Sequence, residues 1–289
     1  MKKIICLIMI LSLASIVCAE KFTMKPYAGY TSVSLSNLYS VLGEEKDIIE
    51  KDKFDTYDDV TASLKKAKGA SIVGIDFDYA ITEKILIGPR VAYIDVSKIE
   101  LKTKRNADNL IKDWIGTYES SKNETITQKF DLSLLPITVG AKYVNDNSEK
   151  FRFNVGLDLG VGLAKLDMET MREEEYTSHS SFFGDYYRKS LEINNQRTYV
   201  GSCFVTNLAV GGEYKLNDTF SLGANIGYRF AKVNKMKLDK DYCDYYENDD
   251  GDEYEYLEKK GDTKKDIDDN DIEFDFSGVT LTCGLNMAF

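Results

Sequence analysis

The chain has few of the residues that form disulfides, bend the backbone or commonly act in catalysis. Its 289 residues include three prolines, one tryptophan, one histidine and five cysteines. Cys203, Cys243 and Cys283 lie beyond the N-terminal segment, and an odd number at such wide spacing excludes a secreted domain held together by disulfides. The formal net charge of −11 argues against nucleic acid as a partner.

Long hydrophobic runs are also missing. No run beyond the N-terminus approaches the roughly 18 apolar residues that a membrane helix needs. The apolar run over 4–17 is shorter, follows two lysines and ends in small residues suited to cleavage before Glu20. This pattern predicts a signal peptide over 1–19 and one domain over 20–289. Lipidation of Cys18 is the weaker alternative, because Val17 is bulky for a lipoprotein signal.

The chain does contain strict alternation. Apolar side chains occupy every second position from Val279 to Phe289, and threonine, glycine, asparagine or alanine fills the positions between them. A period of two predicts a strand with one apolar and one small or polar face. A tilted strand that crosses a bilayer in a barrel wall needs about 9–11 such residues.

Seven earlier segments show a similar pattern, most clearly the one over 151–166. The eight predicted strands are 22–36, 69–82, 85–103, 126–143, 151–166, 197–216, 220–236 and the final 279–289. Their connections alternate between long and short, the long ones being 37–68, 104–125, 167–196 and 237–271. A soluble meander gives no reason for that asymmetry, whereas outer-membrane barrels have long outer loops and short periplasmic turns.

The ending on Phe289 after alternating apolar residues resembles the terminal strand of bacterial outer-membrane β-barrel proteins. The resemblance covers nearly the whole mature chain and is to the small OmpA-, OmpX- and OmpW-like barrels. It implies an all-β, eight-stranded antiparallel up-and-down transmembrane barrel with long extracellular loops. It further implies outer-membrane lipid as surroundings and Phe289 as the signal read by the barrel-assembly machinery.

Charged side chains fall on the inward face of the predicted strands. Four acids and four bases share that phase: Asp76, Asp78, Asp158 and Glu213, with Arg90, Lys142, Arg152 and Arg229. An eight-stranded barrel is just wide enough for side chains to fill. Charges buried there persist only when paired, so we expect an ion-pair network that plugs the lumen. A narrow gated pore for small solutes or ions is the alternative.

Local patterns give three further expectations. A set of aromatics should form a girdle near the periplasmic ends of the strands: Tyr27, Tyr79, Tyr143, Phe151, Tyr214, Phe220 and Phe289. The outward set of strand 126–143 changes phase at Pro136, which predicts a bulge there. Helical spacing within 56–67 and 108–115 predicts two short helices in the long loops.

The fourth long segment, 237–271, carries most of the negative charge. It holds 15 acidic residues against six lysines, with tyrosines between them. The stretch 248–251 does not place ligands as a calcium loop would, so we predict no metal site and no cofactor. A solvated acidic loop is the simple interpretation, and contact with an extracellular partner is the functional one.

The only histidine, His179, lies beside Ser178, Ser180 and Ser181 in the third long segment. Some small outer-membrane barrels modify lipids with such residues, but neighbours in sequence do not make a catalytic triad. We therefore predict a non-enzymatic outer-membrane barrel with a plugged lumen, for envelope structure or surface interaction. A lipid-modifying enzyme and a soluble secreted barrel remain alternatives.

Overall fold

The structure, a computed structural model, is an almost entirely antiparallel β protein. It describes residues 22–51, 59–67, 69–96, 98–112, 117–180, 184–247, 253–264 and 271–289. The predicted signal peptide lies outside these residues. Within them, no helix is long and apolar enough to cross a membrane.

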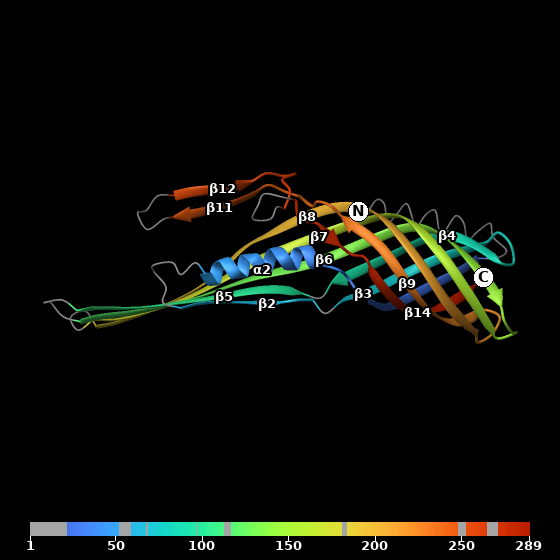
Figure 1. Cartoon of the computed structure of the whole chain (residues 1–289), viewed down its shortest axis with the longest axis horizontal. Coiled ribbons are helices and arrows are strands. Elements are labelled where there is room, and N and C mark those ends of the chain that lie inside the picture. The colour runs from blue at the N-terminus through green and yellow to red at the C-terminus, as the bar shows by residue number, and fades with distance from the viewer. Residues whose placement is uncertain are drawn as a thin grey trace.

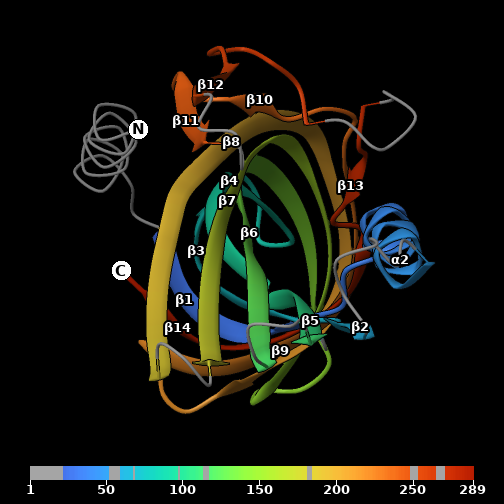
Figure 2. The same ribbon diagram turned by 90° about the vertical axis from the view of Figure 1, so that its left-hand side faces the viewer.

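Eight strands close into a ring in chain order (Figures 1 and 2). They are β1 (Phe22–Thr31), β3 (Ala70–Ala80), β4 (Ile85–Val96), β6 (Thr117–Asp146), β7 (Phe151–Ser180), β8 (Gly184–Lys215), β9 (Phe220–Val233) and β14 (Gly278–Ala288). Each pairs antiparallel with the next, and β14 pairs with β1. The predicted eight-stranded up-and-down barrel is therefore confirmed.

The ring is joined at its two terminal aromatics. The Phe289 amide donates to the Phe22 carbonyl at 2.8 Å, and the two rings lie 6.3 Å apart. Closure leaves the barrel wall without an unpaired edge.

Two of the predicted long loops are largely strands. β5 (Ile99–Lys112) pairs with the first half of β6, and β7 and β8 stay paired from the barrel to their distal turn. Together with β2 (Asp59–Lys65), they form an open sheet beyond the barrel, here called the projecting sheet (Figure 1). The prediction of loops over 104–125 and 167–196 was wrong. Strands that are already paired at the barrel rim can add further backbone hydrogen bonds without the entropy cost of closing a new loop.

The two helices were predicted at the wrong positions in the sequence. The helix α2 spans Ser36–Lys51, almost entirely within the long connection expected over 37–68, and it buries Leu38 and Leu42. The segment predicted as helical around Leu64 is strand β2, since its alternate side chains Val60 and Ala62 are buried. The second expected helix begins inside strand β5, and residues 113–116 lie outside the described part.

The fourth long segment also contains strands. β11 (Tyr242–Glu247) and β12 (Glu253–Glu258) form a separate hairpin. β10 (Lys237–Leu238) pairs with β8, and β13 (Phe274–Asp275) pairs with β9. The stretch 248–251, set aside above as a calcium loop, lies outside the described residues.

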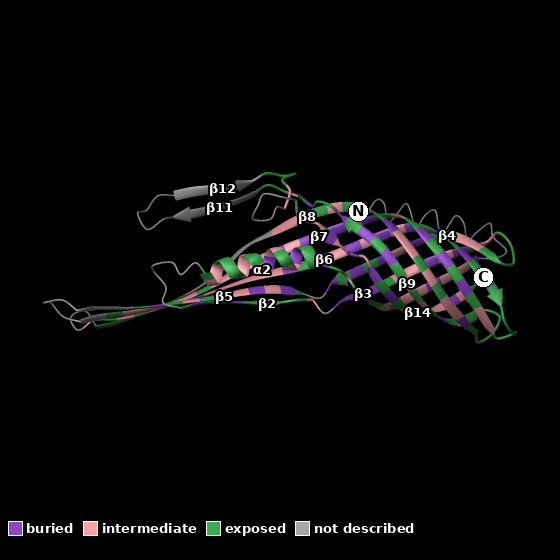
Figure 3. Cartoon of the chain, viewed as in Figure 1, coloured by how far each residue is buried: buried purple, intermediate pink, exposed green. Residues whose placement is uncertain are grey.

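The inward face changes character along the barrel axis, and burial alternates along each strand (Figure 3). Phe130, Leu132 and Leu134 point inward and are almost fully buried. The β6–β7 register runs through Pro136 without a shift, so the predicted bulge was wrong. These three apolar residues do not mark a change of phase. They point inward because the half of the barrel near the projecting sheet has a hydrophobic core.

Candidate functional site

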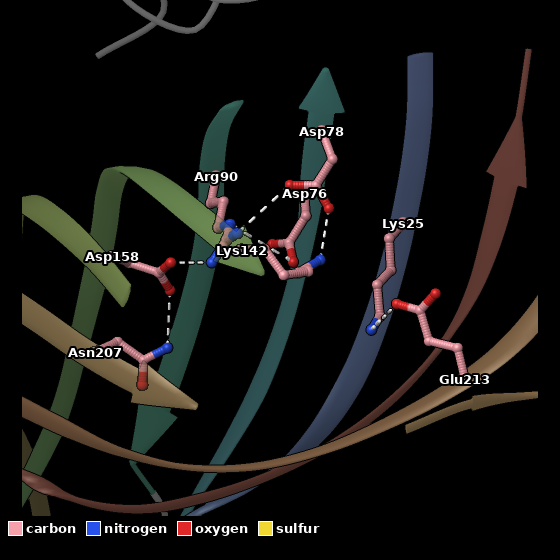
Figure 4. Close-up of polar contacts among 8 residues, drawn as sticks. All are labelled: Lys25, Asp76, Asp78, Arg90, Lys142, Asp158, Asn207 and Glu213. Carbon is pink, nitrogen blue, oxygen red and sulfur yellow. Dashed lines mark hydrogen bonds and ion pairs between the residues drawn. The ribbon is translucent and has the colours of Figure 1, made fainter. Parts of the chain in front are cut away.

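Acidic and basic side chains meet inside the half of the barrel nearest the short turns (Figure 4). Arg90 on β4 lies at the centre, with Nη2 3.4 Å from Asp78 Oδ1, Nε 3.9 Å from Asp76 Oδ2 and Nη1 in contact with Asp158. Lys142 Nζ on β6 binds Asp78 Oδ2 at 2.5 Å. All five side chains are buried, so the cluster compensates most of the charge it removes from water.

The strand register explains this convergence. Asp76 is the direct cross-strand neighbour of Arg90, and Gly140 is the neighbour of Asp158. A Cβ atom at Gly140 would lie 2.2 Å from Asp158 Oδ1 and 2.5 Å from Arg90 Cζ. The glycine therefore leaves the space that the Arg90–Asp158 pair occupies.

The cluster includes residues that the sequence reasoning missed. Asn207 donates from Nδ2 to Asp158 Oδ2 at 2.8 Å. Lys25, almost fully buried, lies 4.0 Å from Glu213. The sequence did carry a signal for Lys25, because it falls two residues from Tyr27 on a face that continues with Gly29 and Thr31.

Two of the eight predicted network residues are placed differently. Arg152 lies at the start of β7, where its Nε binds Asp146 at the end of β6 at 2.7 Å, and both side chains are exposed. Arg229 is buried, and its hydrogen bonds go to a backbone carbonyl and a hydroxyl instead of a carboxylate. It donates to the Phe276 carbonyl from Nε at 3.0 Å and from Nη2 at 2.7 Å, and to Thr31 Oγ1 at 3.1 Å.

The local structure explains the hydrogen-bond partners of Arg229. β13 ends at Asp275 and β14 begins at Gly278, so the Phe276 carbonyl lies between two strands. The guanidinium satisfies this buried carbonyl with two hydrogen bonds, and the neutral acceptor leaves its positive charge uncancelled.

Beyond Arg229 the lumen is apolar. Wall residues such as Ile94, Leu134 and Val233 are fully buried there. They pack in one cluster with residues from the α2 region and from the 234–276 connection: Leu35, Leu38, Leu42, Met236, Leu238, Ile272, Phe274 and Phe276. This core lies at the end of the lumen nearest the projecting sheet.

The remaining spaces in the barrel are small or confined to one end. A cavity of about 80 Å³ lies among the ion pairs, lined by residues including Tyr27, Asp76 and Arg229. A larger one of about 600 Å³ opens at the short turns, with Asp78 and Glu213 in its lining. The Asp78–Lys142 pair lies between the two cavities, since Lys142 lines the smaller one and Asp78 the larger one.

The outer face of the barrel is an exposed apolar belt. Along β7 it runs from Phe153 through Leu157 to Val161, each about half exposed, and ends at Lys165. Neighbouring strands repeat the pattern, with these exposed residues: Val73, Tyr79, Tyr93, Val139, Tyr143, Phe204, Leu208, Val210, Tyr214, Leu222, Ile226, Tyr228, Phe230, Val279 and Leu281. A patch that encircles a protein exceeds what water-soluble monomers expose.

The predicted aromatic girdle is only partly as described. Tyr79, Tyr143 and Tyr214 are each about half exposed on the outside near the short turns. Tyr27 was misplaced, since it lines the inner cavity opposite Gly74 and Gly284. The glycines on both neighbouring strands give its ring room inside.

His179 lies in the projecting sheet, in solvent. Its Nδ1 contacts Asp185 on the neighbouring strand, and that hydrogen bond, with the charge of Asp185, raises the pKa of His179 above its usual value. Ser178 and Ser180 are adjacent positions in the same strand, so their side chains point to the opposite face. Within the described residues no group of three potential ligands is placed to hold a metal ion.

A closed eight-stranded antiparallel barrel, apolar outside and filled by side chains inside, has the architecture of small outer-membrane β-barrel proteins. The structure matches the crystal structure of the attachment invasion locus protein Ail of Yersinia pestis, at 9% sequence identity and a TM-score of 0.34. That match covers 94% of this chain and 99% of the other.

Two further structures match over 94% of this chain. One is the outer membrane protease OmpT from Escherichia coli, with 9% sequence identity, a TM-score of 0.37 and 98% of its chain covered. The other is the outer membrane protein OprG from Pseudomonas aeruginosa, with 12% sequence identity, a TM-score of 0.34 and 96% of its chain covered. No family model and no curated protein sequence matches the chain. The fold itself is established by the closed strand pairing.

Proposed function

We propose that this chain is a non-enzymatic integral protein of the bacterial outer membrane, whose plugged barrel anchors a projecting surface for interaction with partners. One observation carries the proposal: a belt of half-exposed apolar side chains surrounds a closed barrel. Surrounded by water, the belt would cost about 25 cal/mol for each Å² it exposes, whereas lipid tails accept it freely.

The belt has the height that a bilayer requires. Along β7 the apolar outward positions run from Phe153 to Leu163, about 11 residues, which is the length of a tilted membrane strand. Charged residues such as Asp95, Lys165 and Lys232 take over on the outward face beyond it. The short turns bound the other side, so we infer that they face the periplasm and that the projecting sheet faces outward.

The chain termini support the same location. The signal peptide expected over 1–19 supplies export, and the exposed ring of Phe289 ends the outward row of β14. We propose that this row is the surface read by the barrel-assembly machinery. Outer-membrane lipid then surrounds the belt.

The outward part offers charge rather than a reaction centre. The segment 237–271 holds 15 acidic residues against six lysines, and its hairpin β11–β12 lies on the side of the projecting sheet (Figure 1). A strongly acidic surface attracts basic partners and repels acidic ones. We propose that it contacts an extracellular partner.

Membrane fractionation tests the proposal most directly. The protein should stay with membranes after a carbonate wash, and the unheated, folded form should migrate differently from the heated form on a gel. Recovery of the native protein in the aqueous phase would overturn the membrane location. Discrete openings in planar bilayers would overturn the plugged lumen and favour the narrow channel.

A further inference from the structure

The projecting sheet has a free edge at its distal end. β8 pairs with β9 only from Val205 to Lys215, and with β10 at Tyr199 and Val200. In the part of the chain that the structure describes, no strand pairs with the other side of 184–190. An unpaired strand edge presents backbone donors and acceptors that can accept another strand.

The tip of this edge carries a self-complementary set of side chains. Residues 185–189 read Asp-Tyr-Tyr-Arg-Lys, and all five are exposed. Tyr186 and Tyr187 show more than half of their surface. The strand therefore presents an acidic residue, then two aromatic residues, then two basic residues.

We propose that two copies of this chain join through this edge, with their β8 strands antiparallel and the two-fold axis at Tyr187. Asp185 then lies opposite Lys189 of the second copy, and Tyr186 lies opposite Arg188 of the second copy. Directly opposed charges on antiparallel strands stabilise the pair, and an arginine over a tyrosine ring adds a cation–π contact. The interface uses the same patch on both copies, as a two-fold interface must.

The direction of β8 places the second copy on a facing membrane. β8 runs from the distal turn at Gly184 toward the barrel, so two copies in one membrane would align their β8 strands in parallel. That alignment puts Asp185 beside Asp185 and Lys189 beside Lys189, which is repulsive. Copies that project toward each other from opposed surfaces meet antiparallel and overlap only at their tips.

This inference rests on the proposed membrane anchorage, since it needs the sheet to point away from a surface. Contacts within one copy leave the edge available. Asp185 meets His179 and the Tyr187 hydroxyl donates to Glu175, both on β7, so they hold these side chains on the face without using the outer backbone edge. The alternating charges oppose other registers and protect the edge from general aggregation.

Vesicle clustering tests the inference. Two populations of liposomes with different dyes, each carrying the full-length protein with its sheet outward, should associate and transfer fluorescence. The variants D185K and K189D should each lose clustering with themselves. A mixture of D185K vesicles and K189D vesicles should cluster, because every lysine again meets an aspartate, and the double variant D185K/K189D should cluster with itself.

The control variant is K84D, a lysine-to-aspartate change in a short turn at the other end of the barrel, which should cluster like the parent. Loss of clustering in K189D without rescue in the mixture or the double variant would overturn the self-pairing. So would equal clustering of all variants.

A second measurement separates this inference from the proposed function. Sedimentation of the purified protein in detergent should show dimers for the parent and for D185K/K189D, and monomers for each single variant. Normal membrane insertion and heat-dependent gel mobility without charge-dependent pairing would reject the self-association and leave the membrane proposal standing. Failure of insertion with dimers in detergent would do the reverse.

Discussion

At the scale of single residues, the lumen depends on one guanidinium. Arg90 contacts Asp76, Asp78 and Asp158, so three buried carboxylates share it as a partner. Lys142 compensates only Asp78 by a short contact. Removing Arg90 would leave three buried carboxylates without their shared partner.

The variant R90A should therefore lose about 3–5 kcal/mol of stability, as is typical when one partner of a buried ion pair is removed. Urea titration followed by the gel shift between folded and unfolded forms measures the change. R152A is the matched control, because Arg152 pairs with Asp146 in solvent and exposed pairs contribute about 0–1 kcal/mol. Equal losses for the two variants would contradict the central role of Arg90.

Gly140 gives a second test of the same cluster. A methyl group there would meet Asp158 and the Arg90 guanidinium at less than 3 Å, so G140A should displace that pair. We expect a loss of about 1–3 kcal/mol, the usual cost of overpacking. G43A, in helix α2, has open space around the added carbon and should not destabilise the chain. The same urea titration compares the two.

The sequence predicted which side chains point into the barrel wherever a strand had one polar and one apolar face. The inward positions of Asp76, Asp78, Arg90, Lys142 and Asp158 follow from alternation alone. Their partners do not, since alternation fixes the face and leaves open which strands converge at one height. Arg229 is an example: only the break in the neighbouring strand explains why a carbonyl, and no carboxylate, receives it.

At the scale of elements, α2 is held by a partly polar contact. Glu45 hydrogen-bonds Gln128 on β6 and lies near Lys264. Burial, the largest influence, raises the pKa of Glu45 above its ordinary value, so the docked helix binds a proton more tightly than the free helix does. Docking is therefore most stable below the ordinary pKa of glutamate and weakens as the pH rises through the raised value.

The variant E45Q should dock more firmly than the parent at neutral pH, because it removes the ionised form. Hydrogen exchange of the 36–51 amides, followed by mass spectrometry, should be slower at neutral pH and equal to the parent at pH values where Glu45 is protonated in both states. E44Q, one residue away on the exposed side, serves as the control. Faster exchange in E45Q would show that the Lys264 attraction dominates instead.

Element boundaries were less predictable than element faces. The expected strands 151–166 and 197–216 extend into β7 and β8 because their polar ends remain paired outside the belt. A polar strand without an apolar face carries no period-two signal, so sequence alone could not separate it from a loop. The α2 helix was missed because its segment fell in the polar connection expected over 37–68, where the two buried residues Leu38 and Leu42 are too few to give a clear helical period.

At the scale of the whole molecule, the belt sets where the barrel can reside. Leu157 lies near its middle and is about half exposed. The variant L157R should lose about 2–4 kcal/mol when folded into a bilayer, the usual cost of an arginine on the lipid face at the midplane. K165E, on the same strand at the rim, should change stability by less than about 1 kcal/mol. Urea titration in liposomes gives both values.

The proposed plug in the lumen predicts that ions do not pass through the barrel. With an ion-pair layer in one half and an apolar core in the other, the parent protein should show no discrete conductance in planar bilayers. R229A removes the contacts to Phe276 and Thr31 but leaves the apolar core, so it should be less stable and still closed. Openings in R229A alone would identify the Phe276 segment as the element that seals the barrel.

The contact between Phe22 and Phe289 has a consequence for biogenesis. These residues stand at opposite ends of the folded sequence, and Ser32 and Val279, 247 positions apart, also meet across the same seam. The seam therefore cannot form while β14 is still being made, and local contacts cannot assist it. Until then the chain exposes two open edges and an apolar face, which make the unclosed chain prone to aggregation in water.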